Sequence, residues 1–103
     1  MKVNLNITKT HIKNGVKTDP SDCPIASSIK DKIKNLERVS VFVDYATIIV
    51  SRNNRNQYLR ASLNDMASSF VRRFDGGMAI KPFKVTLNFA KEAANAYLVK
   101  TKG

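Results

Sequence analysis

The stretch Arg38–Ser51, R-V-S-V-F-V-D-Y-A-T-I-I-V-S, decides the fold, because it is the densest β-branched run in the chain. Val39, Val41 and Val43 occupy odd-numbered positions, whereas Ala46, Ile48 and Val50 occupy even-numbered ones. A single strand would send these two sets to opposite faces, since side chains alternate along a strand. A turn at Asp44–Tyr45 instead places both sets on one face, with position 43 opposite 46, 41 opposite 48 and 39 opposite 50. The stretch therefore predicts a β-hairpin.

The turn and the second face of this hairpin are less well defined. Tyr45 tolerates the positive φ of a tight turn poorly, so the sequence also allows a bulge or a slightly longer turn. The second face would carry the apolar side chains of Phe42 and Ile49. We expect the C-terminal segment, a second copy of the chain or a partner to cover it. The candidate interface residues are Phe42, Ile49, Tyr97 and Leu98.

Other elements follow from the periodicity of apolar residues. The pattern predicts a strand at 1–8, helices at 23–36 and 62–75, a strand at 82–89 and a helix at 90–99. After a loop at 51–56, Gln57–Ala61 can add a third strand to the hairpin, with Leu59 opposite Ile49. The expected N-caps are Ser21 or Asp22 for the first helix and Ser62 for the second; Thr8 or Thr10 would cap a short turn at 11–13.

This order, β-α-β-β-(β)-α-β-α, predicts one α+β domain over residues 1–103. Two helices with single apolar stripes would pack on half-buried strands. We expect a two-layer sandwich in which two helices cover one face of a sheet. The sheet would have four to five strands, antiparallel or mixed, in a ferredoxin-like order.

Composition restricts the class of protein. The chain has 103 residues and 43% hydrophobic residues, enough for one real core. No apolar run reaches membrane-spanning length, and the alternating N-terminus has no apolar core of a signal peptide. A single cysteine excludes an internal disulfide and fits a reducing compartment. One His, one Cys and scattered carboxylates form no metal-site pattern, and we expect no cofactor.

The charge balance is strongly basic, with 18 Lys and Arg against 8 Asp and Glu, a net charge of +10. A basic domain of this size often binds a polyanion. An excess of lysine also keeps a small protein soluble without any such partner. Composition alone leaves both interpretations open.

The polar segment after the hairpin is the most suggestive binding element. Between Asp44 and Asp65 the chain contains no acid. Arginines offer forked donors to phosphate, asparagines can hydrogen-bond adenine, and tyrosine can stack on a base. An ordinary solvated turn would have a similar composition, since Asn favours turns. The candidate nucleic-acid-binding residues are Arg52, Asn53, Asn54, Arg55, Tyr58 and Arg60. Stacking on the strands themselves is disfavoured, because Ala46–Ser51 has no aromatic residue and Phe42 stands alone.

One pair of residues could support catalysis. Cys23 precedes a predicted helix, whose dipole could stabilise a thiolate, and His11 could act as its base. Alternatively Cys23 is a small buried residue and His11 a surface or packing residue. No third group that would orient the histidine is visible, so we expect a non-catalytic protein.

The residues Thr8-x-x-His11-Ile12-x-x-Gly15, followed by Cys23-Pro24-Ile25-Ala26-x-x-Ile29, resemble a pattern in a group of small uncharacterised bacteriophage proteins. Those proteins share an N-terminal strand, an H-I-x-x-G turn and a C-P-I-A helix start. The resemblance implies a phage or prophage origin and a location in the host cytoplasm. No functional residue carries over, because the group has no assigned activity.

Two functions remain as hypotheses. The first is a phage accessory protein that binds DNA or RNA through the Arg/Asn-rich segment. The second is an inhibitor that binds a host defence or transcription protein through the Phe42/Ile49 face or the C-terminal helix.

Overall fold

The computed structural model describes residues 1–91 and contains five strands and three helices. In chain order these are β1 (Lys2–Ile7), α1 (Lys9–Asn14), α2 (Pro24–Lys32), β2 (Leu36–Val41), β3 (Tyr45–Arg52), β4 (Arg55–Ser62), α3 (Asp65–Asp75) and β5 (Phe83–Asn88). The strands form a three-stranded sheet of order β2-β3-β4 and a two-stranded sheet of β1 and β5, and every pairing is antiparallel. The predicted α+β class is confirmed.

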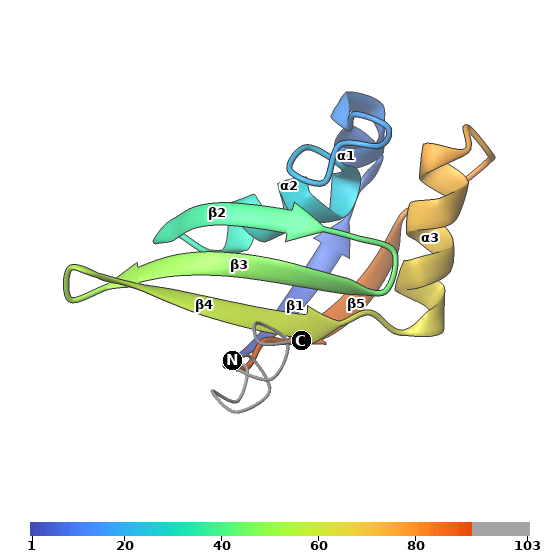
Figure 1. Ribbon diagram of the computed structural model, residues 1–103. Coiled ribbons are helices and arrows are strands. Elements are labelled where there is room, and N and C mark those ends of the chain that lie inside the picture. Colours follow the sequence, from blue (N-terminus) through green and yellow to red (C-terminus); the bar gives the residue numbers. More distant parts are fainter. Residues whose placement is uncertain (92–103) are drawn as a thin grey trace.

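A single β-bridge joins the two sheets. The amide of Arg60 in β4 donates to the carbonyl of Ala90, and the amide of Ala90 donates to the carbonyl of Arg60, both at 2.9 Å. In Figure 1 the β2-β3-β4 sheet lies in front, β1 and β5 cross behind it, α2 lies behind β2, and α3 stands beside the strand ends. The predicted single sheet is therefore divided in two, and the ferredoxin-like order is not confirmed.

The core fills the space behind the front sheet. Its centre is contributed by alternate residues of the strands and by the apolar stripe of α2. Residues with less than 2% exposure include Ile7, Ile25, Ile29, Ala46, Ile48, Val50, Leu87 and Phe89. Phe70 of α3 closes one end, with its ring centroid 4.7 Å from that of Phe83.

The β2–β3 hairpin has the predicted inner face but a different register. Val39 and Val41 share the buried face with Ala46, Ile48 and Val50, as parity predicts. Val41 pairs with Ala46, however, so the register is two residues away from the predicted one, and the loop extends over 42–44. Tertiary contacts hold this longer loop: Ser68 of α3 donates to the carbonyl of Val43, and the amide of Leu63 donates to that of Asp44 at 2.9 Å.

The predicted loop at 51–56 contracts to the two-residue turn Asn53–Asn54. Both strands of this hairpin are therefore longer than expected. In the resulting register Leu59 pairs with Ile48, and Tyr58 takes the predicted place of Leu59 opposite Ile49. This shift by one residue places Leu59 in the core and Tyr58 on the open side, which fits their polarity.

The helices are shorter than predicted. Helix α2, predicted at 23–36, ends at Lys32 because Ile33 is extended (φ −112°, ψ 109°) and Leu36 already belongs to β2, where it pairs with Val50 of β3. Its N-cap is Cys23, whose sulfur accepts from the amide of Ala26 at 3.4 Å, and not Ser21 or Asp22. Helix α3, predicted at 62–75, has Asn64 and not Ser62 as its N-cap. The predicted helix at 90–99 does not begin where expected, because Ala90 lies in the bridge and Lys91 is not helical; its remaining residues, 92–99, fall outside the described residues.

Candidate nucleic-acid interface

The tip of the β3–β4 hairpin displays four of the predicted binding residues. Asn53 (φ 50°) and Asn54 (φ 62°) both have positive φ, which defines a tight turn of type I′ and suits asparagine. Arg52 and Arg55 form the last strand pair beside this turn. All four side chains are exposed. In Figure 1 this tip extends beyond the other elements, so a large ligand can reach it.

A polar groove of about 280 Å³ lies between the base of the tip and the ends of β1 and β5. It is lined by Met1, Arg52, Gln57, Leu59, Asn88, Phe89, Ala90 and Lys91. Two cationic residues, Arg52 and Lys91, line it together with Met1, whose ammonium donates to the carbonyl of Phe89 at 2.7 Å. Within residues 1–91, none of the lining residues is acidic, so this part of the groove is suited to an anionic group.

The predicted residues Tyr58 and Arg60 lie apart from the groove, on the opposite face of the sheet. They alternate along β4 with the buried residues Leu59 and Ala61. Tyr58 is 47% exposed and pairs with Ile49 of β3. The structure therefore divides the predicted binding residues into a tip group and a face group.

The face group includes aromatic residues that the sequence interpretation missed. Because β3 begins at Tyr45 and not after it, Tyr45 is a strand residue on the open face. Its ring centroid lies 4.9 Å from that of Phe42, and the guanidinium carbon of Arg60 lies 3.9 Å above it. The expectation that Phe42 stands alone is thus wrong. A predicted register that paired Val41 with Ala46 would have made Tyr45 a strand residue and so would have predicted the cluster.

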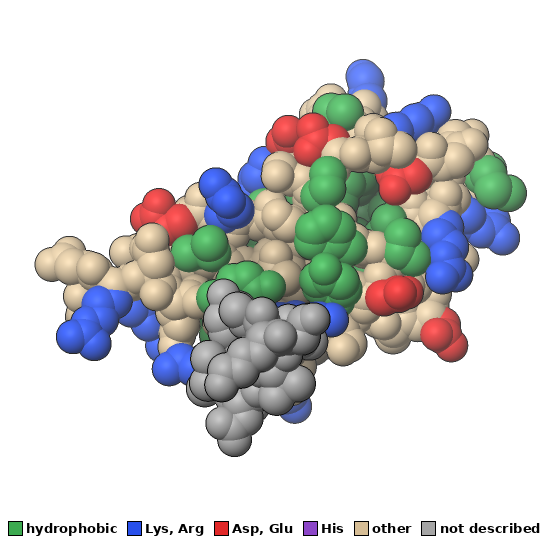
Figure 2. Space-filling view, in the orientation of Figure 1, with side chains coloured by type: hydrophobic (Ala, Val, Ile, Leu, Met, Phe, Trp, Pro, Cys, Tyr) green, Lys and Arg blue, Asp and Glu red, His purple; other side chains and the backbone are tan. Residues whose placement is uncertain are grey.

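The predicted interface residues lie on the same open face. Phe42 is 38% exposed, whereas Ile49 is half-buried between Arg38 and Tyr58 on the neighbouring strands. The other two, Tyr97 and Leu98, lie outside the described residues. In Figure 2 hydrophobic side chains gather over the middle of this face, and Lys and Arg side chains lie at the hairpin end.

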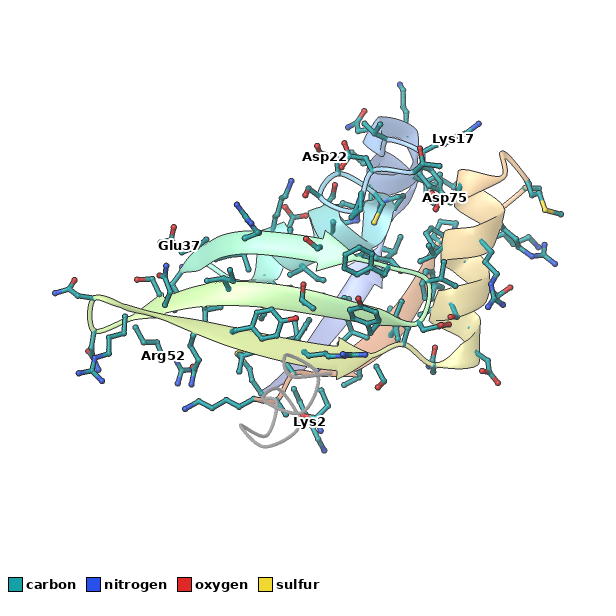
Figure 3. The ribbon with its side chains drawn as sticks, viewed as in Figure 1. Lys2, Lys17, Asp22, Glu37, Arg52 and Asp75 are labelled. Atoms are coloured by element: carbon teal, nitrogen blue, oxygen red, sulfur yellow. The ribbon has the colours of Figure 1, made fainter. Side chains whose placement is uncertain are left out.

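The charges are unevenly distributed over the described part of the chain. The chain has 8 acids, and without Glu92, which lies outside residues 1–91, seven remain. Those seven lie on α2, β2, α3 and the connecting segments, and none lies on β1, β3, β4 or β5. Some offset neighbouring cations: Asp22 bonds Lys30 at 2.9 Å, and Asp44 lies 3.9 Å from Arg72. Figure 3 shows Arg52 and Lys2 on one side of the molecule and Asp22 and Asp75 on the other.

The residues that resemble the phage pattern form a structural joint between α1 and α2. His11 and Thr8 cap α1 reciprocally: the His11 amide donates to the Thr8 hydroxyl at 3.2 Å, and the Thr8 amide donates to His11 Nδ1 at 3.0 Å. His11 Nε2 lies 2.6 Å from Asp31 of α2. Gly15 leaves room for Pro24, whose Cδ would lie 2.7 Å from any added Cβ. The pattern is therefore accounted for by packing.

The catalytic interpretation of Cys23 and His11 gains no support from this joint. Cys23 is 5% exposed, and burial raises the pKa of its thiol, which disfavours the thiolate that a nucleophile needs. Both ring nitrogens of His11 already contact other groups. Within residues 1–91, no three His, Cys, Asp or Glu side chains gather in a way that could hold a metal ion.

The chain matches no protein-family model, and comparisons with curated proteins and with solved structures also find no match. The resemblance to phage proteins thus stays a prediction. In the part of the chain that the structure describes, no helix is long and apolar enough to cross a membrane.

Proposed function

We propose that this protein binds nucleic acid without catalysis and that the β3–β4 hairpin supplies the main phosphate contacts. One observation carries the proposal: an exposed tip with paired arginines, Arg52 and Arg55, ends a hairpin that has no acid on either strand. Arginine binds phosphate through two parallel hydrogen bonds, and a nearby carboxylate would compete for it. The tip thus projects two arginines, and neither of its strands carries a carboxylate that would compete with phosphate for them.

The groove beside the tip supports a longer path for the phosphate backbone. Arg52 belongs to both the tip and the groove, and Lys91 and the Met1 ammonium continue the positive charge toward the ends of β1 and β5. Such a series of cations suits a polymer with regularly spaced charges better than one small anion. Sequence-independent binding with strong salt dependence is the expected behaviour.

The test is a fluorescence-anisotropy titration of labelled single-stranded and duplex oligonucleotides over a series of salt concentrations. For duplex, log affinity should fall by about 0.9 per log unit of salt for each phosphate neutralised. Changing Arg52 and Arg55 together to Ala should weaken binding and reduce this slope by up to about two contacts. Absence of binding at low salt would refute the proposal.

The double variant Arg72→Ala/Arg73→Ala is a matched control. It removes the same charge from exposed positions on α3, away from the hairpin. If the hairpin makes the contacts, this control should keep nearly the wild-type affinity and slope. If both double variants lose affinity equally, net charge and not the hairpin is responsible.

A second candidate function rests on the open face, where Phe42 and Tyr58 expose much of their rings. Exposed aromatic carbon also suits a host-protein partner, the inhibitor role that the sequence suggested. A pull-down from host lysate, with and without nuclease, checks this candidate. A protein that is retained after nuclease treatment and lost from Phe42→Ala would support it.

A further inference from the structure

We infer that the open face of the β2-β3-β4 sheet is a base-stacking platform, so that the preferred ligand is single-stranded nucleic acid and not duplex. This inference rests on the proposed function and extends it from phosphate binding to the class of nucleic acid. It is carried by Phe42, Tyr45, Tyr58 and Arg60, which the fold brings from the 42–44 loop, β3 and β4 onto one face.

The flat groups on this face are arranged as two neighbouring stations. At one station the Arg60 guanidinium lies 3.9 Å above the Tyr45 ring, and the Phe42 ring lies 4.9 Å from Tyr45. At the other, Tyr58 stands across from Ile49. Tyr58 and Arg60 are two residues apart on β4, about 7 Å at the usual rise per residue. Bases that are neighbours on one strand can therefore rest at neighbouring stations.

Cross-strand packing accounts for part of this arrangement. Tyr45 contacts both Phe42 and Arg60, and such pairs stabilise sheets. Packing does not account for Tyr58, which is 47% exposed although it lies in the middle of β4. A large ring left open to solvent on a rigid strand is a common feature of sites that stack bases.

The charge of the face suits a nucleic acid. Its outward-pointing residues include Arg38 and Arg60; Glu37, in the bulge of the edge strand β2, is an exposed acid next to Arg38. Polar residues also interrupt the apolar ones, because Ser40, Thr47 and Arg60 form a row between Phe42 and the pair of Ile49 and Tyr58. A protein-docking face would be more continuously apolar. Separate rings on a positive surface match separate bases on a phosphate backbone.

The hairpin tip and the open face then have different roles in binding. The tip arginines neutralise phosphates in any nucleic acid, whereas the face reads the exposed planes of unpaired bases. Bases in a duplex are stacked on each other and cannot reach the rings, so only a single strand can use both sites at once.

The experiment compares the full chain on three ligands with matched phosphate number: a labelled single strand of thymidines or uridines, an abasic strand and a duplex. Wild-type protein should bind the single strand about tenfold or more tightly than the abasic strand, from the usual worth of one stacked base. Tyr58→Ala should lose about that factor on the single strand and leave the abasic and duplex affinities unchanged. Phe42→Ala should act in the same direction.

Two control variants separate stacking from simple truncation. Tyr58→Phe keeps the ring and should retain the affinity for the single strand. Ser40→Ala truncates a side chain of the same face that belongs to neither station and removes no ring, and should leave all three affinities near wild type. Circular dichroism melting curves check that each variant is folded.

The outcomes distinguish this inference from the proposed function. If the single strand and the abasic strand bind equally, or if Tyr58→Ala and Phe42→Ala change nothing while Arg52→Ala/Arg55→Ala weakens all ligands, the platform is refuted and the proposed function stands. If no ligand binds at low salt, both are refuted. Thymidine and uridine strands compared side by side show whether DNA or RNA is bound more tightly.

Discussion

The two faces of the β2-β3-β4 sheet are built from the same strands but have different compositions. The inner face presents small and branched aliphatic residues that are almost fully buried: Val39, Val41, Ala46, Ile48, Val50, Leu59 and Ala61. The outer face presents rings, hydroxyls and arginines that are half-buried or exposed. The inner face can therefore contribute to stability by excluding water, whereas the rings of the outer face remain available to a ligand. Substitutions on the two faces should have separable effects.

The largest expected difference is between two adjacent isoleucines of β3. Ile48 on the inner face is 1% exposed, whereas Ile49 on the outer face is half-buried. Ile48→Ala should lower the free energy of unfolding by about 2–5 kcal/mol, since it leaves a cavity in the core. Ile49→Ala should cost about 1 kcal/mol or less. Urea denaturation of both variants measures the contrast, and equal costs would mean that the outer face is covered.

A smaller effect is expected at the joint that holds α2 behind the sheet. In Gly15→Ala the new Cβ would lie 2.7 Å from Cδ of Pro24, so the joint must shift. We expect a loss of about 1–3 kcal/mol in the free energy of unfolding, as for other overpacked sites. Gly76→Ala is a milder comparison and should cost less, because its Cβ would lie 3.2 Å from the carbonyl oxygen of Arg72, a tight contact that a shift of a few tenths of an ångström relieves. Nucleic-acid binding by Gly15→Ala should be unchanged wherever the variant is folded.

Substitutions at the hairpin tip should change the free energy of unfolding only slightly, and one should raise it while another lowers it. Asn54 has a positive φ of 62°, which glycine adopts without strain and alanine does not. Asn54→Gly should change the free energy of unfolding by less than about 1 kcal/mol, toward greater stability, and Asn54→Ala should cost about 1 kcal/mol. Thermal unfolding checks these signs. A loss of affinity in Asn54→Gly without a loss of stability would show that the Asn54 amide itself contacts the ligand.

The smallest expected effect on stability is that of ionising the buried thiol of Cys23. Because burial raises the pKa of Cys23 above its ordinary value of 9.0, native protein should react slowly with iodoacetamide at mildly alkaline pH. Unfolded protein should react quickly. Since the folded-state pKa is the higher one, any stability from the neutral thiol is complete below the unfolded pKa and is lost as pH rises through the folded pKa. Rapid alkylation of native protein would restore the nucleophile interpretation.

Much of the fold could be predicted from local pattern. Alternation located β1 and β5, and the helical period from Leu63 to Phe74 located α3 to within a turn. Of the binding residues, the Arg/Asn tip was recognised from its composition. The aromatic cluster was missed because it depends on which residues of β2, β3 and β4 lie side by side, and an error of two positions removed Tyr45 from the strand.

The sequence by itself determined which side chains of the hairpin face inward. A strand has a side-chain period of two, so a register error of two residues leaves every residue on its correct face. Parity therefore assigned Val41 and Ile48 to the core although their predicted pairing was wrong. Only the tertiary structure decided the register. The bonds from α3 and its leading segment to Val43 and Asp44 hold a three-residue loop, and no local pattern in the hairpin encodes contacts with residues that follow it by about twenty positions.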